Sequence, residues 1–279
     1  MNDKNHFPPR LVLAATDMSP ASWQAMRYAR MLAELFQAEV LALHAQHFDL
    51  PPYFTDSQVR PLIKELERSR RAAAEHVARQ AQSILGFKPK TLIVEKPAVD
   101  AILQTARSKD ADLVIIGTHG RTGLKRLWLG SVAENVLRHS DRPVLAVRPR
   151  SQTPTLKRIL SPVGWGDAGL QARDYAVALA QAADAHLILL HALEDGRAQK
   201  ACPWDKADIA RRCEVEEVRE KSHPVASILR AAKDMKADLI VMGAQKSRSV
   251  VGSMFSSTTE QVMRLAEAPL LLVPKEDEN

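Results

Sequence analysis

Short apolar runs alternate with longer amphipathic segments along this chain. Leu11–Ala15, Glu39–Ala45 and Leu113–Gly117 are five to seven residues long and mostly apolar at consecutive positions. Runs of this kind are typical of strands buried on both faces of a parallel sheet, and the segments between them have helical periodicity. The pattern therefore predicts an α/β fold with a doubly wound parallel sheet.

Boundary signals locate the elements of the first half. Ser19-Pro20 is typical of a helix start, and Pro51-Pro52 breaks the chain before a long, charged amphipathic segment. We predict strands at Leu11–Ala15, Glu39–Ala45, Thr91–Glu95, Leu113–Gly117 and Pro143–Val147. We predict helices at Ser19 to about Phe36, Ser57 to about Leu85, Val99–Ser108 and about Ser131 to His139.

The second half of the chain repeats the first. Ala111–Val147 aligns without a gap with Ala237–Val273 at an offset of 126, and 11 of the 37 aligned residues are identical. Nearer the start of each half, Leu11–Asp17 matches Arg158–Gly164 at an offset of 147. Because the offsets differ by 21, the second copy lacks 21 residues between its second and third strands. This self-similarity predicts a duplicated domain.

We therefore expect two tandem doubly wound domains of five strands each, at residues 1–148 and 158–279, joined by a linker at 149–157. The stretch Arg148–Lys157 contains Pro, Ser, Gln and Thr but few apolar residues, which is typical of a linker. In the second copy, Leu193–Arg211 replaces the long helix and is compatible with a loop or a short helix. The two domains are expected to pack as an intramolecular pseudo-dimer about a pseudo-twofold axis.

Composition restricts the class of protein. The 39 Lys and Arg residues exceed the 33 Asp and Glu residues by six, and this positive charge permits anion binding. The chain has no apolar run of the ~18–20 residues that cross a bilayer, and its N-terminus does not resemble a signal peptide. We therefore expect a cytoplasmic protein without membrane association. Two cysteines form no disulfide framework, and the 13 aromatic residues and lack of a dense basic cluster argue against a nucleic-acid surface.

The sharpest local feature is a glycine-containing loop after the fourth strand. Gly117 ends that strand, Gly120 follows it, and Gly130-Ser131 opens the next helix. Glycines let the backbone approach a ligand, and the free N–H groups at a helix start favour an anion. Asp17 ends the first strand, at the edge where an open parallel sheet binds its ligand. Positive charge in the loop comes from His119, Arg121, Lys125 and Arg126.

These features together resemble the universal stress protein family. The resemblance rests on Asp17, the strand with His44, Gly117-x2-Gly120-x9-Gly130-Ser131 and Pro143-Val-Leu, and covers about residues 10–148 and 155–275 as a tandem member. It implies an adenine nucleotide alpha hydrolase-like, Rossmann-like fold and ATP as the ligand, with or without Mg²⁺. At the phosphate and ribose end it implies Gly117, Gly120, Gly130, Ser131 and Val132. Around the adenine and ribose it implies Ala15, Asp17, Ala45 and Ile116, where Ala15 and Ala45 replace the Pro and Val frequent in relatives.

Structural explanations compete with these assignments. The glycines can simply form a turn, and Asp17 can cap the turn that follows it. Ser131-x-x-Glu134 is also a capping box, and the second copy retains it without the glycines. For His44 and His191, which recur at one strand position, a hydrogen-bonded core or rim role is favoured over a ligand role.

The second copy departs from the motif, so we predict a single nucleotide site in the N-terminal half. Asp17 becomes Gly164, and Gly120 and Gly130 become Lys246 and Ser256, while Gly243 and Ser257 persist. Gly164-Trp-Gly166-Asp-Ala-Gly169 matches a dinucleotide fingerprint, but its equivalents in the first copy, Asp17, Ser19 and Ser22, are not glycines. Cys202, Cys213 and His223 do not have the spacing of a usual zinc site, so we expect free thiols and no metal site.

The resemblance implies a regulatory role, in which ATP occupancy controls interaction with other proteins during stress. Slow ATP hydrolysis is the enzymatic alternative, although the loop has no evident water-positioning residue and we assign no catalytic residue. A nucleotide-free scaffold or a module for an apolar ligand is the other alternative. The protein partners and any homodimer stay open at this stage.

Overall fold

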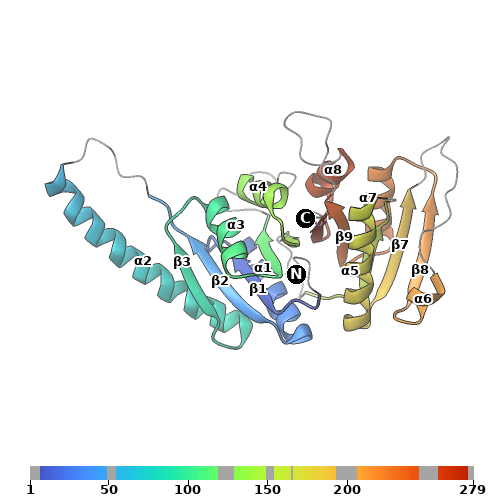
Figure 1. Cartoon of the computed structure of the whole chain (residues 1–279), viewed down its shortest axis with the longest axis horizontal. Coiled ribbons are helices and arrows are strands. Elements are labelled where there is room, and N and C mark those ends of the chain that lie inside the picture. Colours follow the sequence, from blue (N-terminus) through green and yellow to red (C-terminus); the bar gives the residue numbers. More distant parts are fainter. Residues whose placement is uncertain are drawn as a thin grey trace.

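Ten strands form one continuous sheet in the computed structural model (Figure 1). The structure describes residues 7–48, 55–118, 129–148, 154–164, 166–192, 206–244 and 257–275. The first half contributes β1 (Leu11–Ala15), β2 (Glu39–Ala45), β3 (Lys90–Val94), β4 (Leu113–Gly117) and β5 (Val144–Val147). The second half contributes β6 (Arg158–Pro162), β7 (His186–Ala192), β8 (Val215–Glu220), β9 (Leu239–Ala244) and β10 (Leu270–Pro274).

The strand order is β3-β2-β1-β4-β5-β10-β9-β6-β7-β8. All neighbouring strands are parallel except β5 and β10, which pair antiparallel at the centre. In this pair Leu145 lies opposite Leu271, its own equivalent in the repeat, 126 residues later. The two halves are therefore related by a pseudo-twofold axis through the central pair. The prediction of a doubly wound α/β fold with five strands in each half is confirmed.

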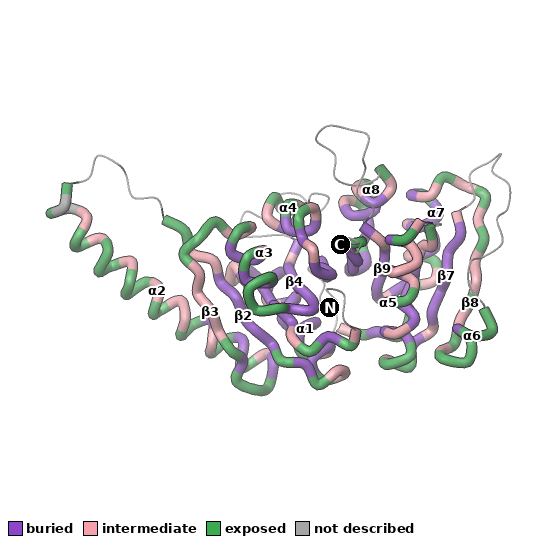
Figure 2. The backbone as a smooth tube through the Cα atoms, in the orientation of Figure 1, coloured by how far each residue is buried: buried purple, intermediate pink, exposed green. Residues whose placement is uncertain are grey.

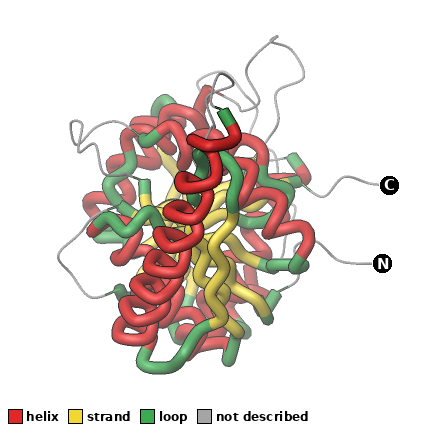
Figure 3. The backbone as a smooth tube through the Cα atoms, turned by 90° about the vertical axis from the view of Figure 1, so that its left-hand side faces the viewer, coloured by secondary structure: helices red, strands yellow, loops and turns green. Residues whose placement is uncertain are grey.

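Helices cover both faces of the sheet, as the end view shows (Figure 3). One buried layer lies between the sheet and α1 (Pro20–Phe36), α2 (Asp56–Leu85), α5 (Asp167–Ala183) and α6 (Lys206–Ala210). The other layer lies under α3 (Ala98–Ser108), α4 (Ser131–His139), α7 (Pro224–Asp234) and α8 (Ser257–Leu265). Each layer contains residues of both halves, and the strands at the centre are the most buried part of the backbone (Figure 2). Within the parts of the chain that the structure describes, no helix combines the length and apolarity needed to cross a membrane.

Most elements lie where the sequence predicts them, within one residue. The third strand occupies Lys90–Val94 and not Thr91–Glu95, because Lys90 already pairs with Leu41 on β2. The last strand of the first half begins at Val144, since Pro143 has no N–H to donate to the sheet. In the segment 193–211, the described residues include the short helix α6. The division into domains at 148 and 158 stays a prediction, although β5 ends and β6 begins close to these positions.

A duplicated aspartate anchors the first strand of each half. The Asp112 carboxylate, directly before β4, accepts hydrogen bonds from the backbone N–H groups of Arg10 and Leu11, at 2.8 and 2.9 Å. Asp238, its equivalent before β9, does the same for Lys157 and Arg158, at 2.9 Å each. This contact explains why the repeat retains aspartate at this position.

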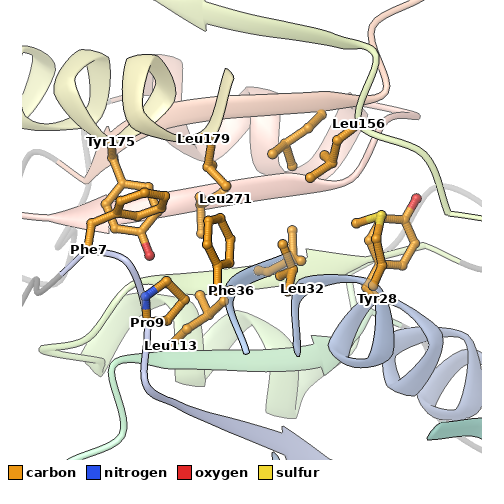
Figure 4. A pocket seen from close by; sticks show the side chains of 13 residues that line it. Phe7, Pro9, Tyr28, Leu32, Phe36, Leu113, Leu156, Tyr175, Leu179 and Leu271 are labelled. Carbon is orange, nitrogen blue, oxygen red and sulfur yellow. The ribbon is translucent and has the colours of Figure 1, made fainter. Parts of the chain in front are cut away.

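Equivalent residues of the two halves meet along the seam between α1 and α5 (Figure 4). The seam contains the equivalent pairs Tyr28 and Tyr175, Leu32 and Leu179, Leu113 and Leu239, and Leu145 and Leu271. Phe7, from the N-terminal segment, breaks this symmetry because its ring lies edge-to-face against Phe36 and Tyr175, with centroids 5.0 and 4.8 Å away. The cavity that remains is about 10 Å³, room for about one water molecule.

Candidate functional site

A cavity of about 260 Å³ opens at the carboxyl ends of β1, β2 and β4 in the first half. This is the edge at which open parallel sheets bind ligands. Of the nine residues that the sequence singles out, eight line this cavity: Ala15, Asp17, Ala45, Ile116, Gly117, Gly130, Ser131 and Val132. The ninth, Gly120, lies outside the described residues. The fold therefore brings segments more than 100 residues apart in the sequence to one cavity.

Part of the cavity wall is apolar. This part consists of the ends of β1, β2 and β4 together with the start of α3, where Ala98 and Ile102 lie four residues apart on one helix face. The strand residues on this side are Ala15, Leu43, Ala45 and Ile116. Three of these six residues, Ala15, Ala45 and Ala98, have small side chains, which leave space for a flat, apolar group.

The floor of the cavity is a turn held by side-chain hydrogen bonds. The Thr16 hydroxyl lies 2.9 Å from the Ser22 hydroxyl and accepts the Met18 N–H at 3.0 Å. Asp17 Oδ1 accepts the Ser19 N–H at 3.0 Å, so the carboxylate does cap the turn that begins α1. The same residue lines the cavity, and its two roles are compatible.

His44 is a structural residue of this turn. Its Nδ1 lies 2.8 Å from the Thr16 carbonyl oxygen, and its side chain is buried. A hydrogen bond at this distance requires a proton on Nδ1, because a carbonyl only accepts. The expectation of a hydrogen-bonded core histidine is thus confirmed for His44.

Another part of the cavity wall is the N-terminus of α4. Gly130 is the N-cap residue, and its N–H donates to the Thr118 carbonyl at 2.8 Å. The next residues, Ser131, Val132 and Ala133, line the cavity from the first turn of the helix. No side chain of the N-cap residue bonds the first N–H groups of this helix, since Gly130 has none. These groups and the helix dipole therefore make this part suitable for an anion.

The capping-box interpretation of Ser131 and Glu134 is wrong. The N-cap is Gly130 and not Ser131, because Glu134 N–H donates to the Gly130 carbonyl as the first helical hydrogen bond, at 2.9 Å. The Glu134 side chain does not reach back to the helix start. It accepts from Arg138 at 2.8 Å and from Arg264 at 3.2 Å.

Gly117 has a packing requirement that the sequence did not reveal. A Cβ at this position would lie 2.8 Å from the Ala21 carbonyl carbon and 2.9 Å from the Ser22 nitrogen. In the second half, a Cβ at Gly243 would lie 2.2 Å from the Ala168 carbonyl oxygen. Both glycines therefore allow the start of a helix to approach a strand, and this explains why Gly243 persists in a copy that has lost the other glycines.

Several cavity residues were not singled out from the sequence: Thr16, Ser22, Leu43, Ala98, Ile102, Thr118 and Ala133. Thr16, Thr118 and Ala133 directly adjoin residues that were, and Leu43 shares a strand face with Ala45. The position of Leu43 follows from the alternation of β2 once the site is located, and the other three follow from their sequence neighbours. Ala98 and Ile102 carry no such signal, because only the packing of α3 brings them to the cavity.

In the second half, the fingerprint-like glycines serve a local contact. A Cβ at Gly169 would lie 2.5 Å from the Gly164 carbonyl oxygen, so the glycine lets the first turn of α5 pack on the preceding turn. Lys246, Ser256 and Cys202 lie outside the described residues. Burial raises the pKa of the Cys213 thiol, which makes it a weak nucleophile. Among the residues that the structure describes, no three His, Cys, Asp or Glu side chains are grouped as a metal site.

Comparisons with known proteins agree with this architecture. The model of the universal stress protein family matches residues 9–148 and 197–274. A universal stress protein of Methanocaldococcus jannaschii is 33% identical over 140 residues, which are 49% of this chain and 81% of the relative. A universal stress protein of Mycobacterium tuberculosis is 26% identical over 290 residues and matches 94% of this chain and 95% of its own length.

A solved structure extends the likeness to the whole fold. The crystal structure of a universal stress protein from Archaeoglobus fulgidus matches 97% of this chain and 100% of its own, with a TM-score of 0.75 and 22% sequence identity. The family model alone matches more than half of the residues, and the expected resemblance is thereby confirmed. This chain belongs to the universal stress protein family.

Proposed function

We propose that this protein binds ATP in the cavity of its N-terminal half, within a domain of residues 1–148, and acts as a nucleotide-dependent regulator in the stress response. One observation carries the proposal: the cavity wall combines apolar side chains at strand termini with the N-terminus of α4. An adenine nucleotide has the matching chemistry, with a flat base at one end and phosphates at the other. The first N–H groups of α4 would receive phosphate oxygens.

Asp17 is the carboxylate best placed to fix the orientation of the ligand. It lines the cavity at the end of β1, and a carboxylate accepts hydrogen bonds from ribose hydroxyls or from an amino group. It is also the one acidic side chain among the described residues of the cavity wall. A Mg²⁺ ion that accompanied ATP would therefore be held mainly by phosphate oxygens and water, which is common for this ion. Regulated binding fits this wall better than turnover, for which a positioned water and charge stabilisation are needed.

Filling the apolar part of the cavity tests the proposal. The Ala98→Phe variant places a ring where the base would lie, at a half-buried residue that begins a helix. Isothermal titration should give one ATP site per chain for the wild type and at least about tenfold weaker binding for the variant, a loss of about 1.4 kcal/mol. Ala78→Phe is the control, because Ala78 is a half-buried alanine of α2 outside the cavity wall. Unchanged affinity in Ala98→Phe, or two sites per chain, would contradict the assignment.

The Asp17→Asn variant distinguishes the contact of the Asp17 side chain with the ligand from its role as the cap of the turn. The amide keeps an oxygen that can accept the Ser19 N–H, so the turn is retained while the charge is removed. The exposed Asp100→Asn variant makes the same change in net charge and serves as the control.

Comparing adenosine, AMP and ATP tests the N-terminus of α4, because affinity should rise with the number of phosphates that its N–H groups can receive.

A further inference from the structure

Four charged side chains join α4 of the first half to α8 of the second. Glu134 and Arg138 on α4 are the repeat equivalents of Glu260 and Arg264 on α8. Contacts of 2.8 Å (Glu134 to Arg138), 3.1 Å (Arg138 to Glu260), 3.0 Å (Glu260 to Arg264) and 3.2 Å (Arg264 to Glu134) close a ring. We call these four residues the charge ring.

The charge ring is partly shielded from water. The side chains of Arg138, Glu134 and Glu260 are 14%, 25% and 29% exposed, and that of Arg264, the most exposed of the four, is 43% exposed. Each carboxylate contacts one guanidinium of its own helix and one of the opposite helix, so charges alternate around the ring. Removing a single arginine therefore leaves two partly buried carboxylates to share one guanidinium, which costs more than the loss of an exposed ion pair.

A second link runs from β5 to the end of α8. Arg148 directly follows β5 and donates from Nη2 to the carbonyl oxygens of Met263 and Arg264, at 3.2 and 2.6 Å. These carbonyls belong to the last turn of α8, where a positive side chain is favourable. The last turn of the helix is thus tied to the first half from a second direction.

Both links lead to residues close to the cavity wall. The Thr118 N–H donates to the Val147 carbonyl at 2.9 Å, directly before Arg148, and the Thr118 carbonyl accepts the Gly130 N–H at 2.8 Å. Glu134 is three residues after Ser131, about 4.5 Å along the helix axis, so the charge ring lies within about one turn of the N–H groups at the cavity. A change in the position of α8 therefore displaces the helix start that forms one wall.

We propose that α8 of the second half positions the N-terminus of α4, with Arg264 as the principal positioning residue, and that ligand binding in the cavity is thereby coupled to the second half. The coupling rests on the proposed nucleotide function, whereas the positioning of α4 does not. By linkage the coupling is reciprocal, so a partner that shifts α8 changes nucleotide affinity, and the nucleotide changes the affinity for that partner.

Arg264→Ala and Arg264→Lys test the proposal, with Arg230→Ala as the matched control. Arg230 forms an ion pair with Glu220 at 2.6 Å in the same half, away from the charge ring. In ligand-free protein, hydrogen exchange of residues 131–139 should be at least about fivefold faster in Arg264→Ala than in wild type, and unchanged in Arg230→Ala. ATP should bind Arg264→Ala at least about fivefold more weakly, the lower end of usual coupling. Arg264→Lys should recover most of both losses.

The outcomes separate the two proposals. If the wild type binds no ATP in titration, the proposed function fails, and the exchange rates of α4 without ligand still decide whether Arg264 positions it. Wild-type ATP affinity in Arg264→Ala overturns the coupling. Equal losses of ATP affinity in Arg264→Ala and Arg230→Ala also overturn it, because the effect would then be general destabilisation. If α4 exchange is unchanged in Arg264→Ala, the positioning role is overturned as well.

Discussion

Gly117 has no side chain, and this allows α1 to approach β4 closely. A methyl group there would meet backbone atoms of Ala21 and Ser22 at 2.8 to 2.9 Å, and backbone moves less easily than a side chain. We expect Gly117→Ala to lower the free energy of unfolding by about 1–3 kcal/mol, as overpacking does. Urea denaturation measures the change.

Gly164→Ala is the matched control for this prediction. A Cβ at Gly164 would meet no atom within 4 Å, so the alanine should leave stability unchanged or raise it by up to about 1 kcal/mol. Equal stability of Gly117→Ala and the wild type would show that the packing of α1 adjusts at no cost.

His191 makes stability depend on pH. Burial disfavours its charged form and lowers the pKa of the ring below the ordinary 6.5, with Arg219 acting in the same direction and Glu217 against it. The unfolded chain therefore takes up a proton at a pH where the folded ring does not. Stability is lost as pH falls below about 6.5, and the loss is complete once pH is below the folded pKa.

We expect His191→Asn to lose less unfolding free energy than the wild type between about pH 7.5 and about pH 5.5. Urea denaturation at each pH measures the slope. His139→Asn, at an exposed histidine of α4, is the control and should follow the wild type. Parallel curves for His191→Asn and the wild type would rule out this source of pH dependence.

Among single residues, the sequence was a better guide to those of the candidate site than to those that hold the strands in place. Ser131 belongs to a local motif with a defined spacing, and Asp17 ends a strand at the edge where open parallel sheets bind ligands, so their common location could be expected. Asp112 could not be recognised in this way, because its partners Arg10 and Leu11 are more than 100 residues away. Its chemical role becomes visible only after β1 and β4 are paired.

The elements were predictable to the extent that periodicity and boundary residues defined them. The apolar runs of β1, β2 and β4 were located without error, since they are buried on both faces. Helix α4 also lies at the predicted residues, Ser131–His139, but its cap was misidentified. Ser131 has the usual chemistry of a cap, whereas the first helical hydrogen bond, from the Glu134 N–H to the Gly130 carbonyl, makes Gly130 the N-cap.

The ends of α1 and α5 show the same device in both copies. Gln37 and Asp184 have positive φ angles of 54° and 48°, and each donates its N–H back to the last turn of its helix. Neither is the glycine usually found at such a terminus. Duplication has therefore retained a backbone conformation although the side chain at the position has changed.

The seam between the halves depends on an aromatic residue from outside the repeat. Phe7 packs against Phe36 of the first half and Tyr175 of the second. Because its ring is only partly buried, we expect Phe7→Ala to lower the free energy of unfolding by about 2 kcal/mol, less than for a fully buried phenylalanine. Thermal or urea unfolding measures the loss.

Phe48→Ala provides the comparison, because Phe48 is 49% exposed. Its truncation should change stability by no more than about 0.5 kcal/mol. Similar values for the two variants would mean that Phe7 contributes no more than a surface side chain does. The sequence could not predict this contact, since Phe7 precedes the first element and has no periodic neighbours.

The antiparallel pair at the centre of the sheet gives the molecule opposite polarity in its two halves. The strands of the first half run one way and those of the second half run the other, so their carboxyl ends emerge on opposite rims. A partner that docks at the rim of the ligand cavity thus meets, in the second half, the amino ends of the strands. If the proposed function holds, a partner at this rim meets the nucleotide pocket of the first half and not the equivalent edge of the second half.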